Sequence, residues 1–315
     1  MTMPNARFSD YSSAQMEARI VRHADLRPCY NAFIDTRSPG SEAKENFTII
    51  GPGVSENPEQ YVHIAEPHGF NIGGARQPPG CVNSQHSHDT AEVFVVHSGE
   101  WRFDLGEHGD DARLFIGPGD VISIPTHMFR GFTNVGAESG FLFAVLGQDN
   151  PGKVLWAPDV FDMAREHGLV LLETGQLIDT VAGEAVPADA TPMPVTSADQ
   201  IATRKRVGPE EAAAFVWRNE APEGTYATAI IDPAGPLDWA HGFTLARIDI
   251  AAAGTMTMPP PDKPEVVFVQ SGALVMAWGR ESLTLHPGDT MTVPVGLDRA
   301  FSSDGGCSAF IVHGC

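Results

Sequence analysis

Two histidines and a glutamate, His86, His88 and Glu92, form a group whose types and spacing suit metal chemistry. Alternate residues of a β-strand face the same side, so both imidazoles can point to one side of a strand. Glu92 lies further along the same hairpin and can close the metal-binding face. Two imidazoles and one carboxylate suit Fe(II), Mn(II), Ni(II) or Zn(II). We therefore predict that this segment binds one divalent metal ion.

The glycines on either side of this group extend the pattern. Five residues separate Gly80 from His86, and six separate Glu92 from Gly99. The whole run resembles the first cupin motif, G-x5-H-x-H-x3-E-x6-G, at every marked position. The resemblance implies a β-barrel with the two histidines and the glutamate directed into its interior. The alternative is a degenerate barrel in which the histidines only fill space.

The second cupin motif, G-x5-P-x-G-x2-H-x3-N, is matched in part. Gly119, Pro125 and Asn134 are in place, but Arg130 stands where the family has a histidine ligand and His127 where it has a glycine. Arginine stays protonated and does not bind a cation. Either the metal keeps three protein ligands, or His127 joins from the turn as a fourth. The other interpretation of His127 is an exposed turn residue.

The chain repeats this unit once. AEVFVVHSGEW corresponds to PEVVFVQSGAL and IGPGDVISIP to LHPGDTMTVP, which aligns Glu92 with Glu265 and Arg130 with Arg299. Two long copies indicate a duplicated domain rather than a solenoid. Three prolines, 259–261, occupy the place of the H-x-H pair in the second copy. We therefore expect the second copy to bind no metal.

Each copy thus has a glutamate and an arginine at two positions that face the barrel interior. We predict a buried ion pair in each, Glu92–Arg130 and Glu265–Arg299, because an unpaired buried charge is costly. The first pair should be looser if Glu92 also binds the metal. Arg130 has a second possible role, since its planar guanidinium suits the carboxylate or enolate of a substrate.

Short segments rich in Val, Ile, Phe and Trp, bounded by Gly-Pro, Gly-Asp and Ser-Gly turns, predict many short strands. The fold class we expect is all-β, with two double-stranded β-helix (jelly-roll, cupin) barrels and short helical linker segments. The expected domains are an N-terminal arm (1–45), a metal-binding barrel (46–150), a linker with short helices (151–235) and a degenerate barrel (236–315).

The composition of the chain limits the kinds of binding partner that we expect. The 315 residues carry a net charge of −20, which disfavours binding to nucleic acid and to anionic membranes. No apolar run is long enough to span a membrane, no export signal is visible, and the four cysteines suggest no disulfide framework. We expect a cytoplasmic protein with a small-molecule substrate, and a homodimer, since many cupins dimerise.

The resemblance fixes fold better than function, because cupins include enzymes, regulators and storage proteins. Our first hypothesis is a non-haem dioxygenase with iron, or else Mn, Ni or Zn, acting on a small aromatic or enolisable organic anion. Glu92 and Arg130 would be the catalytic residues, and Phe94 and Phe103 would line the substrate pocket beside Arg130. The alternatives are a non-catalytic metal- or small-molecule-binding protein and a metal-dependent decarboxylase or isomerase.

Overall fold

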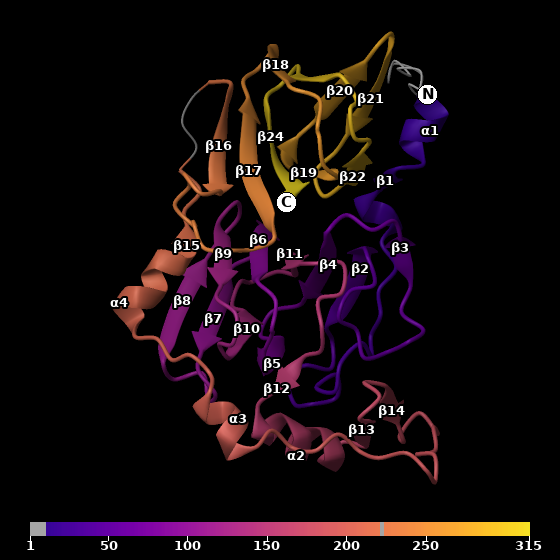
Figure 1. Cartoon of the computed structure of the whole chain (residues 1–315), viewed down its shortest axis with the longest axis vertical. Helices are drawn as coiled ribbons and strands as arrows, with labels where there is room; N and C mark the ends of the chain where they lie inside the picture. Colours follow the sequence, from indigo (N-terminus) through magenta and orange to yellow (C-terminus); the bar gives the residue numbers. More distant parts are fainter. Residues whose placement is uncertain (1–10, 221–223) are drawn as a thin grey trace, which may run out of the picture. The chain divides into compact units, whose positions relative to one another are not determined.

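The computed structural model describes residues 11–220 and 224–315, and the chain divides into two compact units. One unit is Arg27–Asn219, and the other joins Met1–Leu26 to Glu220–Cys315. Figure 1 shows the strands of both units along the chain. Residues 1–10 of the predicted arm and 221–223 of the predicted linker lie outside the described residues.

The unit Arg27–Asn219 contains a barrel made of two facing sheets. The larger sheet has seven strands in the order β15 (Val216–Trp217), β9 (Val121–Ile124), β6 (Glu92–Ser98), β11 (Gly140–Gly147), β4 (Phe70–Gln77), β2 (Glu45–Ile50) and β3 (Val62–Ile64). The smaller sheet has five strands in the order β12 (Leu155–Trp156), β5 (Val82–Ser87), β10 (Arg130–Asn134), β7 (Trp101–Leu105) and β8 (Ala112–Ile116). The described pairings are antiparallel except that of β2 with β3.

Turns that contain glycine carry the chain between strands, often from one sheet to the other. Tight turns join successive strands, and Gly119 takes a positive φ of 83° in the turn before β9, a conformation that favours glycine. Alternating burial on strands such as β8 is the pattern of a sheet with one face toward a core. The strands that carry the metal-ligand candidates, β5 and β6, lie in opposite sheets of this barrel.

The segment after this barrel folds back on it. Helix α2 (Pro158–Glu166) begins with a proline in its first turn and is followed by Gly168 at φ 79°, as the sequence predicts for a short helix. Its buried face packs with Trp156 and Ile34 in one hydrophobic cluster. The remaining elements are β13 (Leu169–Leu171), β14 (Leu177–Asp179), α3 (Ala198–Ala202), α4 (Pro209–Ala212) and the 3-10 helix η2 (Ala213–Phe215).

The second unit also contains two facing sheets. Six strands follow the order β1 (Ile20–Val21), β22 (Thr290–Val293), β19 (Glu265–Gly272), β24 (Cys307–Gly314), β17 (Phe243–Ile250) and β16 (Tyr226–Ile231). Four follow the order β18 (Gly254–Met258), β23 (Arg299–Ser303), β20 (Leu274–Trp278) and β21 (Glu281–Leu285). These sheets, with those of the first unit, confirm the predicted all-β class.

The N-terminal segment is part of this second barrel. Strand β1 pairs with β22, and the short helices α1 (Ser13–Glu17) and η1 (His23–Asp25) flank β1. Met16 on α1 is fully buried in the core cluster of this barrel. None of the helices in the described part of the chain is long and apolar enough to cross a membrane.

Candidate metal centre

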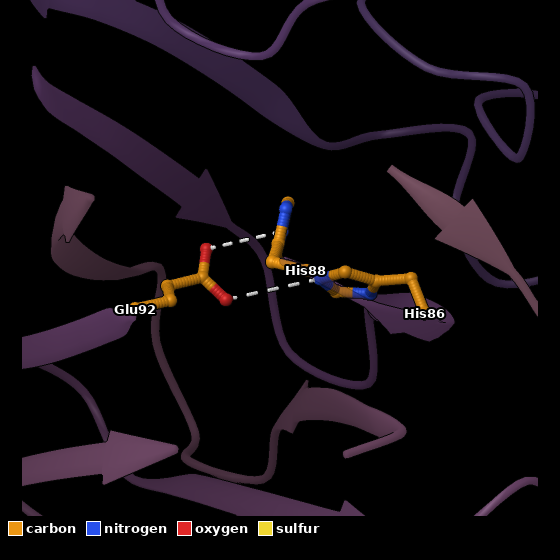
Figure 2. Close-up of side chains that lie close together, drawn as sticks. All are labelled: His86, His88 and Glu92. Carbon is orange, nitrogen blue, oxygen red and sulfur yellow. Dashed lines mark ion pairs between the residues drawn. The ribbon is translucent and has the colours of Figure 1, made fainter. Parts of the chain in front are cut away.

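His86, His88 and Glu92 lie close together where the chain passes from β5 in one sheet to β6 in the other (Figure 2). The hairpin expected from the sequence is thus a connection between the two sheets. His86 is on β5, His88 follows directly after the end of β5, and Glu92 is the first residue of β6. The two histidines are alternate residues, so their rings point to the same side, with ring centroids 5.1 Å apart. Within the described residues, this is the group of histidine, cysteine and acidic side chains whose ligand atoms converge.

The three side chains have the geometry of a metal-binding face. One candidate ligand atom from each lies within 4.8 Å of the others. Glu92 Oε1 is 3.6 Å from Nε2 of His88, and Glu92 Oε2 is 4.0 Å from Nε2 of His86. Nδ1 of His86 lies 2.8 Å from the Ser84 carbonyl, so this nitrogen donates its proton and Nε2 keeps the lone pair. Such a hydrogen bond is the usual way in which a metal-binding histidine is oriented.

The electrostatics fit a divalent ion. Burial, with a contribution from the Arg130 charge, lowers the pKa of His86 to about 3, and the same causes hold the pKa of His88 well below its ordinary value. Both rings are therefore neutral at physiological pH, as metal ligation requires. Burial raises the pKa of Glu92, while the Arg130 guanidinium opposes this rise and stabilises the carboxylate. Two neutral imidazoles and a carboxylate are donors for Mn(II), Fe(II), Ni(II) or Zn(II).

Arg130 is fully buried and pairs with Glu92, which confirms the predicted ion pair. Its Nε and Nη2 donate to Glu92 Oε2 at 3.0 and 2.7 Å, and its Nη1 donates to the Met128 carbonyl at 3.0 Å. Arg130 gives two hydrogen bonds to Glu92 while Arg299 gives one to Glu265, and whether metal binding loosens the first pair stays a prediction. Glu92 Oε1 stays directed toward His88.

A cavity of about 70 Å³ adjoins the three ligand candidates. Its wall is largely apolar and includes Phe94, Phe132, Leu146 and Trp156. A water needs roughly 10–15 Å³ on this measure, so the cavity has room for a small ligand of a few heavy atoms. Of the predicted substrate-binding residues, Phe94 lines the cavity. Phe103 packs behind Phe94, with ring centroids 5.1 Å apart, and Arg130 does not line the cavity.

His127 is not brought into the group of three. It sits at φ 62° in the turn before β10, with its side chain 44% exposed. Its Nδ1 lies 3.2 Å from an Asp89 carboxylate oxygen and 3.0 Å from Nη1 of Arg204. These contacts orient the ring toward Asp89 and Arg204. His127 therefore fits the alternative given for it above, an exposed turn histidine, and not the fourth metal ligand.

The second barrel keeps the ion pair without the histidine pair. Arg299 Nη2 donates to Glu265 Oε2, as predicted, and Arg299 Nη1 donates to the Pro259 carbonyl at 2.9 Å. His313 on β24 is near the same carboxylate oxygen, with Nε2 at 2.5 Å. Large side chains such as Trp278, Met276 and Phe301 fill the interior of this barrel.

Several residues behind the metal-binding face were not found from the sequence. Trp156 packs on His86 with ring centroids 5.4 Å apart, and its indole N–H donates to Glu56 Oε1 at 2.6 Å. A fully buried Lys44–Asp35 ion pair lies behind β5, where Asn83 accepts from Lys44 and lies 3.3 Å from Nδ1 of His86. Nothing in the sequence signalled these residues, because the burial of Lys44 is visible only in the folded structure.

Known proteins share this fold. Residues 75–146 match the family described as Cupin domain. A germin-like protein of Arabidopsis thaliana, subfamily 1 member 7, is 38% identical over 88 residues, which are 26% of this chain and 38% of that relative. Member 10 of the same subfamily is 34% identical over 83 residues, 25% of this chain and 37% of the relative. The matched region thus spans well under half the length of these relatives.

Solved structures extend the likeness to both barrels. Oxalate decarboxylase from Bacillus subtilis aligns with 94% of this chain and 76% of its own, with a TM-score of 0.57 and 12% identity. The Lactobacillus farciminis oxalate decarboxylase–formate complex aligns with 93% of this chain and 85% of its own, with the same TM-score and identity. At this identity the likeness establishes the fold. The chain therefore shares the fold of these oxalate decarboxylases over nearly all of its length, and its residues 75–146 match the cupin domain family.

Proposed function

We propose that the first barrel binds one divalent metal ion through His86, His88 and Glu92, and that the protein is a metal-dependent decarboxylase or isomerase of a small organic acid. The observation that carries the proposal is the convergence of three buried donors on the wall of a small, largely apolar cavity. One of the similar Bacillus subtilis oxalate decarboxylase structures is described by its Mn(II) centres, and we propose manganese as the first metal to test.

The charge of the site favours an anionic substrate. The negative charge of Glu92 is balanced by Arg130, and both histidines are neutral. A divalent ion therefore brings a positive charge that the surrounding protein groups do not offset, and a substrate carboxylate would neutralise it. When bound, the metal supplies Lewis-acid stabilisation of the negative charge that develops on substrate oxygens.

The chain's own residues would set the conditions for this chemistry. Arg130 fixes Glu92 Oε2 with two hydrogen bonds, which leaves Oε1 for the metal-binding face. Phe94, Leu146 and Trp156 form an apolar wall that limits water beside the substrate. In this arrangement Arg130 is a positioning residue for Glu92 rather than a substrate ligand.

The dioxygenase hypothesis remains a second candidate, because three protein donors leave coordination positions that both substrate and oxygen could occupy. Oxygen consumption separates the two. We propose to load the purified protein with manganese or iron(II) and to follow carbon dioxide release, substrate isomerisation and oxygen uptake with a panel of small mono- and dicarboxylates. Carbon dioxide release or isomerisation without oxygen uptake is expected. Oxygen uptake that matches substrate loss would favour a dioxygenase.

A matched pair of variants ties the activity to the site. His88→Ala should abolish both metal binding and turnover. His108→Ala should leave both unchanged, because His108 is an exposed residue of the same barrel, near Glu107 and Asp159. Binding of acids without any turnover would instead support a non-catalytic metal-binding cupin, and metal retained by the His88→Ala protein would refute the proposed centre.

A further inference from the structure

The cavity has a second polar region, made by Asn46 on β2 and Gln60 in the loop that follows β2. Asn46 is more than nine-tenths buried, and its side-chain Nδ2 has no hydrogen-bond partner. Gln60 donates from Nε2 to Thr48 Oγ1 at 2.6 Å, which leaves its buried Oε1 without a partner. A buried polar atom without a partner is costly, so a donor and an acceptor left open beside one cavity indicate a binding role.

Strand register shows how this region relates to the metal-binding face. Residues that pair directly across antiparallel strands share one face of the sheet. One row of pairs crosses β2, β4, β11 and β6, and its members are Thr48, Gly73, Ala144 and Phe94. Glu92 and Asn46 each lie two residues from an end of this row, so both face the same interior. They lie on opposite sides of the row, because Asn46 shares a row with Ala75 and Leu142 whereas Glu92 pairs with Leu146. Their strands are three spacings apart, about 14 Å, and the two positions are also four residues, about 13 Å, apart along the strands before the sheet curves.

Small residues keep the space between these two regions open. Gly73 and Ala144 are the middle members of the row, and both line the cavity together with Ala75. A side chain on Gly73 would also approach the Phe47 carbonyl, since a Cβ there would lie 3.2 Å from that oxygen. The cavity can therefore extend from the Glu92 end toward Asn46 and Gln60.

We propose that Asn46 and Gln60 form a subsite for an uncharged hydroxyl group at the far end of the substrate, so that the substrate class is a small hydroxy-monocarboxylate. This inference rests on the proposed function, which assigns the carboxylate end to the metal. A hydroxyl group can accept from an amide N–H such as Asn46 Nδ2 and donate to an amide oxygen such as Gln60 Oε1, so this one group offers what both open atoms need. No lysine or arginine is among the described residues that line the cavity, so a second carboxylate would have no cation there.

The test compares ω-hydroxy acids, from 3-hydroxypropanoate to 6-hydroxyhexanoate, with alkanoates that carry a methyl group in place of the hydroxyl. Binding to the manganese-loaded full chain is measured by calorimetry. At least one hydroxy acid should bind about tenfold more tightly than its methyl counterpart, because the counterpart leaves both polar atoms unpaired. Asn46→Leu and Gln60→Met should each reduce this ratio toward one with unchanged metal content. Gln176→Met, at an exposed position of the same unit, should keep it.

The outcomes separate the two proposals. A ratio near one for every pair in the wild-type protein, or a ratio that persists in the Asn46→Leu protein, overturns the subsite while the metal centre stands. If no acid of either series binds the manganese-loaded protein, the proposed function fails and the subsite fails with it.

The thermal stability of the metal-free protein gives a test that does not depend on binding. Asn46→Leu should raise Tm because it removes an unpartnered buried amide, whereas a lowered Tm would assign Asn46 a structural role and contradict the proposal.

Discussion

Arg130 is the residue that most distinguishes the first barrel from the cupin motif that its sequence resembles. It lies across from His86 in the β10–β5 pair, and its guanidinium turns to Glu92 rather than to the cavity. An arginine here removes a ligand and neutralises a carboxylate. The metal-binding face is thereby reduced to three donors, and Glu92 is fixed in one orientation before any metal binds.

Replacing Arg130 should therefore be costly. Arg130→Met leaves the Glu92 carboxylate buried without its partner, and we expect the free energy of unfolding to fall by about 3–5 kcal/mol. Arg165→Met is the control, because Arg165 and its partner Asp162 are 64% and 65% exposed, and exposed pairs contribute about 0–1 kcal/mol. Chemical denaturation of both variants measures the difference. Equal losses for the two would contradict the role of Arg130.

The three ligand candidates could be predicted from the sequence because they are local. His86, His88 and Glu92 lie within seven residues, and strand alternation alone places the histidines on one side. Asn46, Glu56 and Trp156 reach the same cavity or its rear wall from distant elements. Their positions depend on the register of β2 with β4 and of β12 with β5, which no local pattern of the sequence specifies.

At the scale of elements, the segment Ala32–Glu56 and strand β12 form the rear wall of the site. Glu56 Oε2 accepts from the Ile34 amide at 2.7 Å, and its Oε1 accepts from Trp156. The Glu56 carboxyl thus ties one loop and one short strand together behind His86. Burial, the largest cause, raises the pKa of Glu56 to about 8, although both hydrogen bonds oppose this rise.

Glu56 should give the protein a pH-dependent stability. Its pKa is raised in the folded state, so folding retains a proton that the unfolded chain loses above its ordinary pKa of 4.5. The contribution is complete below that value and declines as pH rises toward about 8, by up to about 1.4 kcal/mol per pH unit. Unfolding curves between these limits should show a steeper decline for the wild type than for Glu56→Gln, which does not ionise. Parallel pH profiles would contradict it.

The N-terminal segment belongs to the second barrel, although it is far from the rest of that barrel in the sequence. The sequence predicted an N-terminal arm (1–45) without assigning it to a barrel, and in the structure strand β1 pairs with β22 at the edge of the six-stranded sheet. Arg22 supports this pairing through Asp289 at 2.8 Å, and Trp278 donates to the Tyr11 carbonyl at 2.7 Å. The sequence could not reveal this pairing, because a strand of two residues is too short to show the alternation of apolar and polar residues.

A core substitution in this arm should destabilise the second barrel specifically. Met16→Ala removes a fully buried side chain, and we expect a loss of about 2–5 kcal/mol. Hydrogen exchange should report the loss of protection in β19, β22 and β24, while β5 and β6 of the metal-binding barrel stay protected. Glu17→Ala, at an exposed neighbouring position, is the control. Loss of protection that appears first in β5 and β6 would contradict the assignment.

At the scale of the whole molecule, duplication has left two barrels that each keep a buried glutamate–arginine ion pair but have different interiors. The first has histidines and a cavity beside its glutamate. In the second, the glutamate is surrounded by Arg299, His313 and a closely filled apolar core. The repeat in the sequence predicted the two barrels, and the three prolines predicted the missing histidine pair. The packing that fills the second interior follows from many tertiary contacts, which the repeat does not encode.

The same chemical change in the two barrels should therefore have different effects on metal content. Glu92→Gln and Glu265→Gln each replace a buried carboxylate by an amide beside a buried arginine, so both should lower the free energy of unfolding by a few kcal/mol. Glu92→Gln also removes a metal ligand, and we expect manganese affinity to fall at least tenfold. Glu265→Gln should leave the wild-type content, which we predict to be at most one ion per chain. Elemental analysis after dialysis against manganese measures the manganese content of both variants.

Two ions per chain in the wild type, or a loss of manganese from a folded Glu265→Gln protein, would place a metal in the second barrel. In that case Glu265 and His313, the donors nearest each other there, would be the ligands to test next, since Arg299 cannot bind a cation.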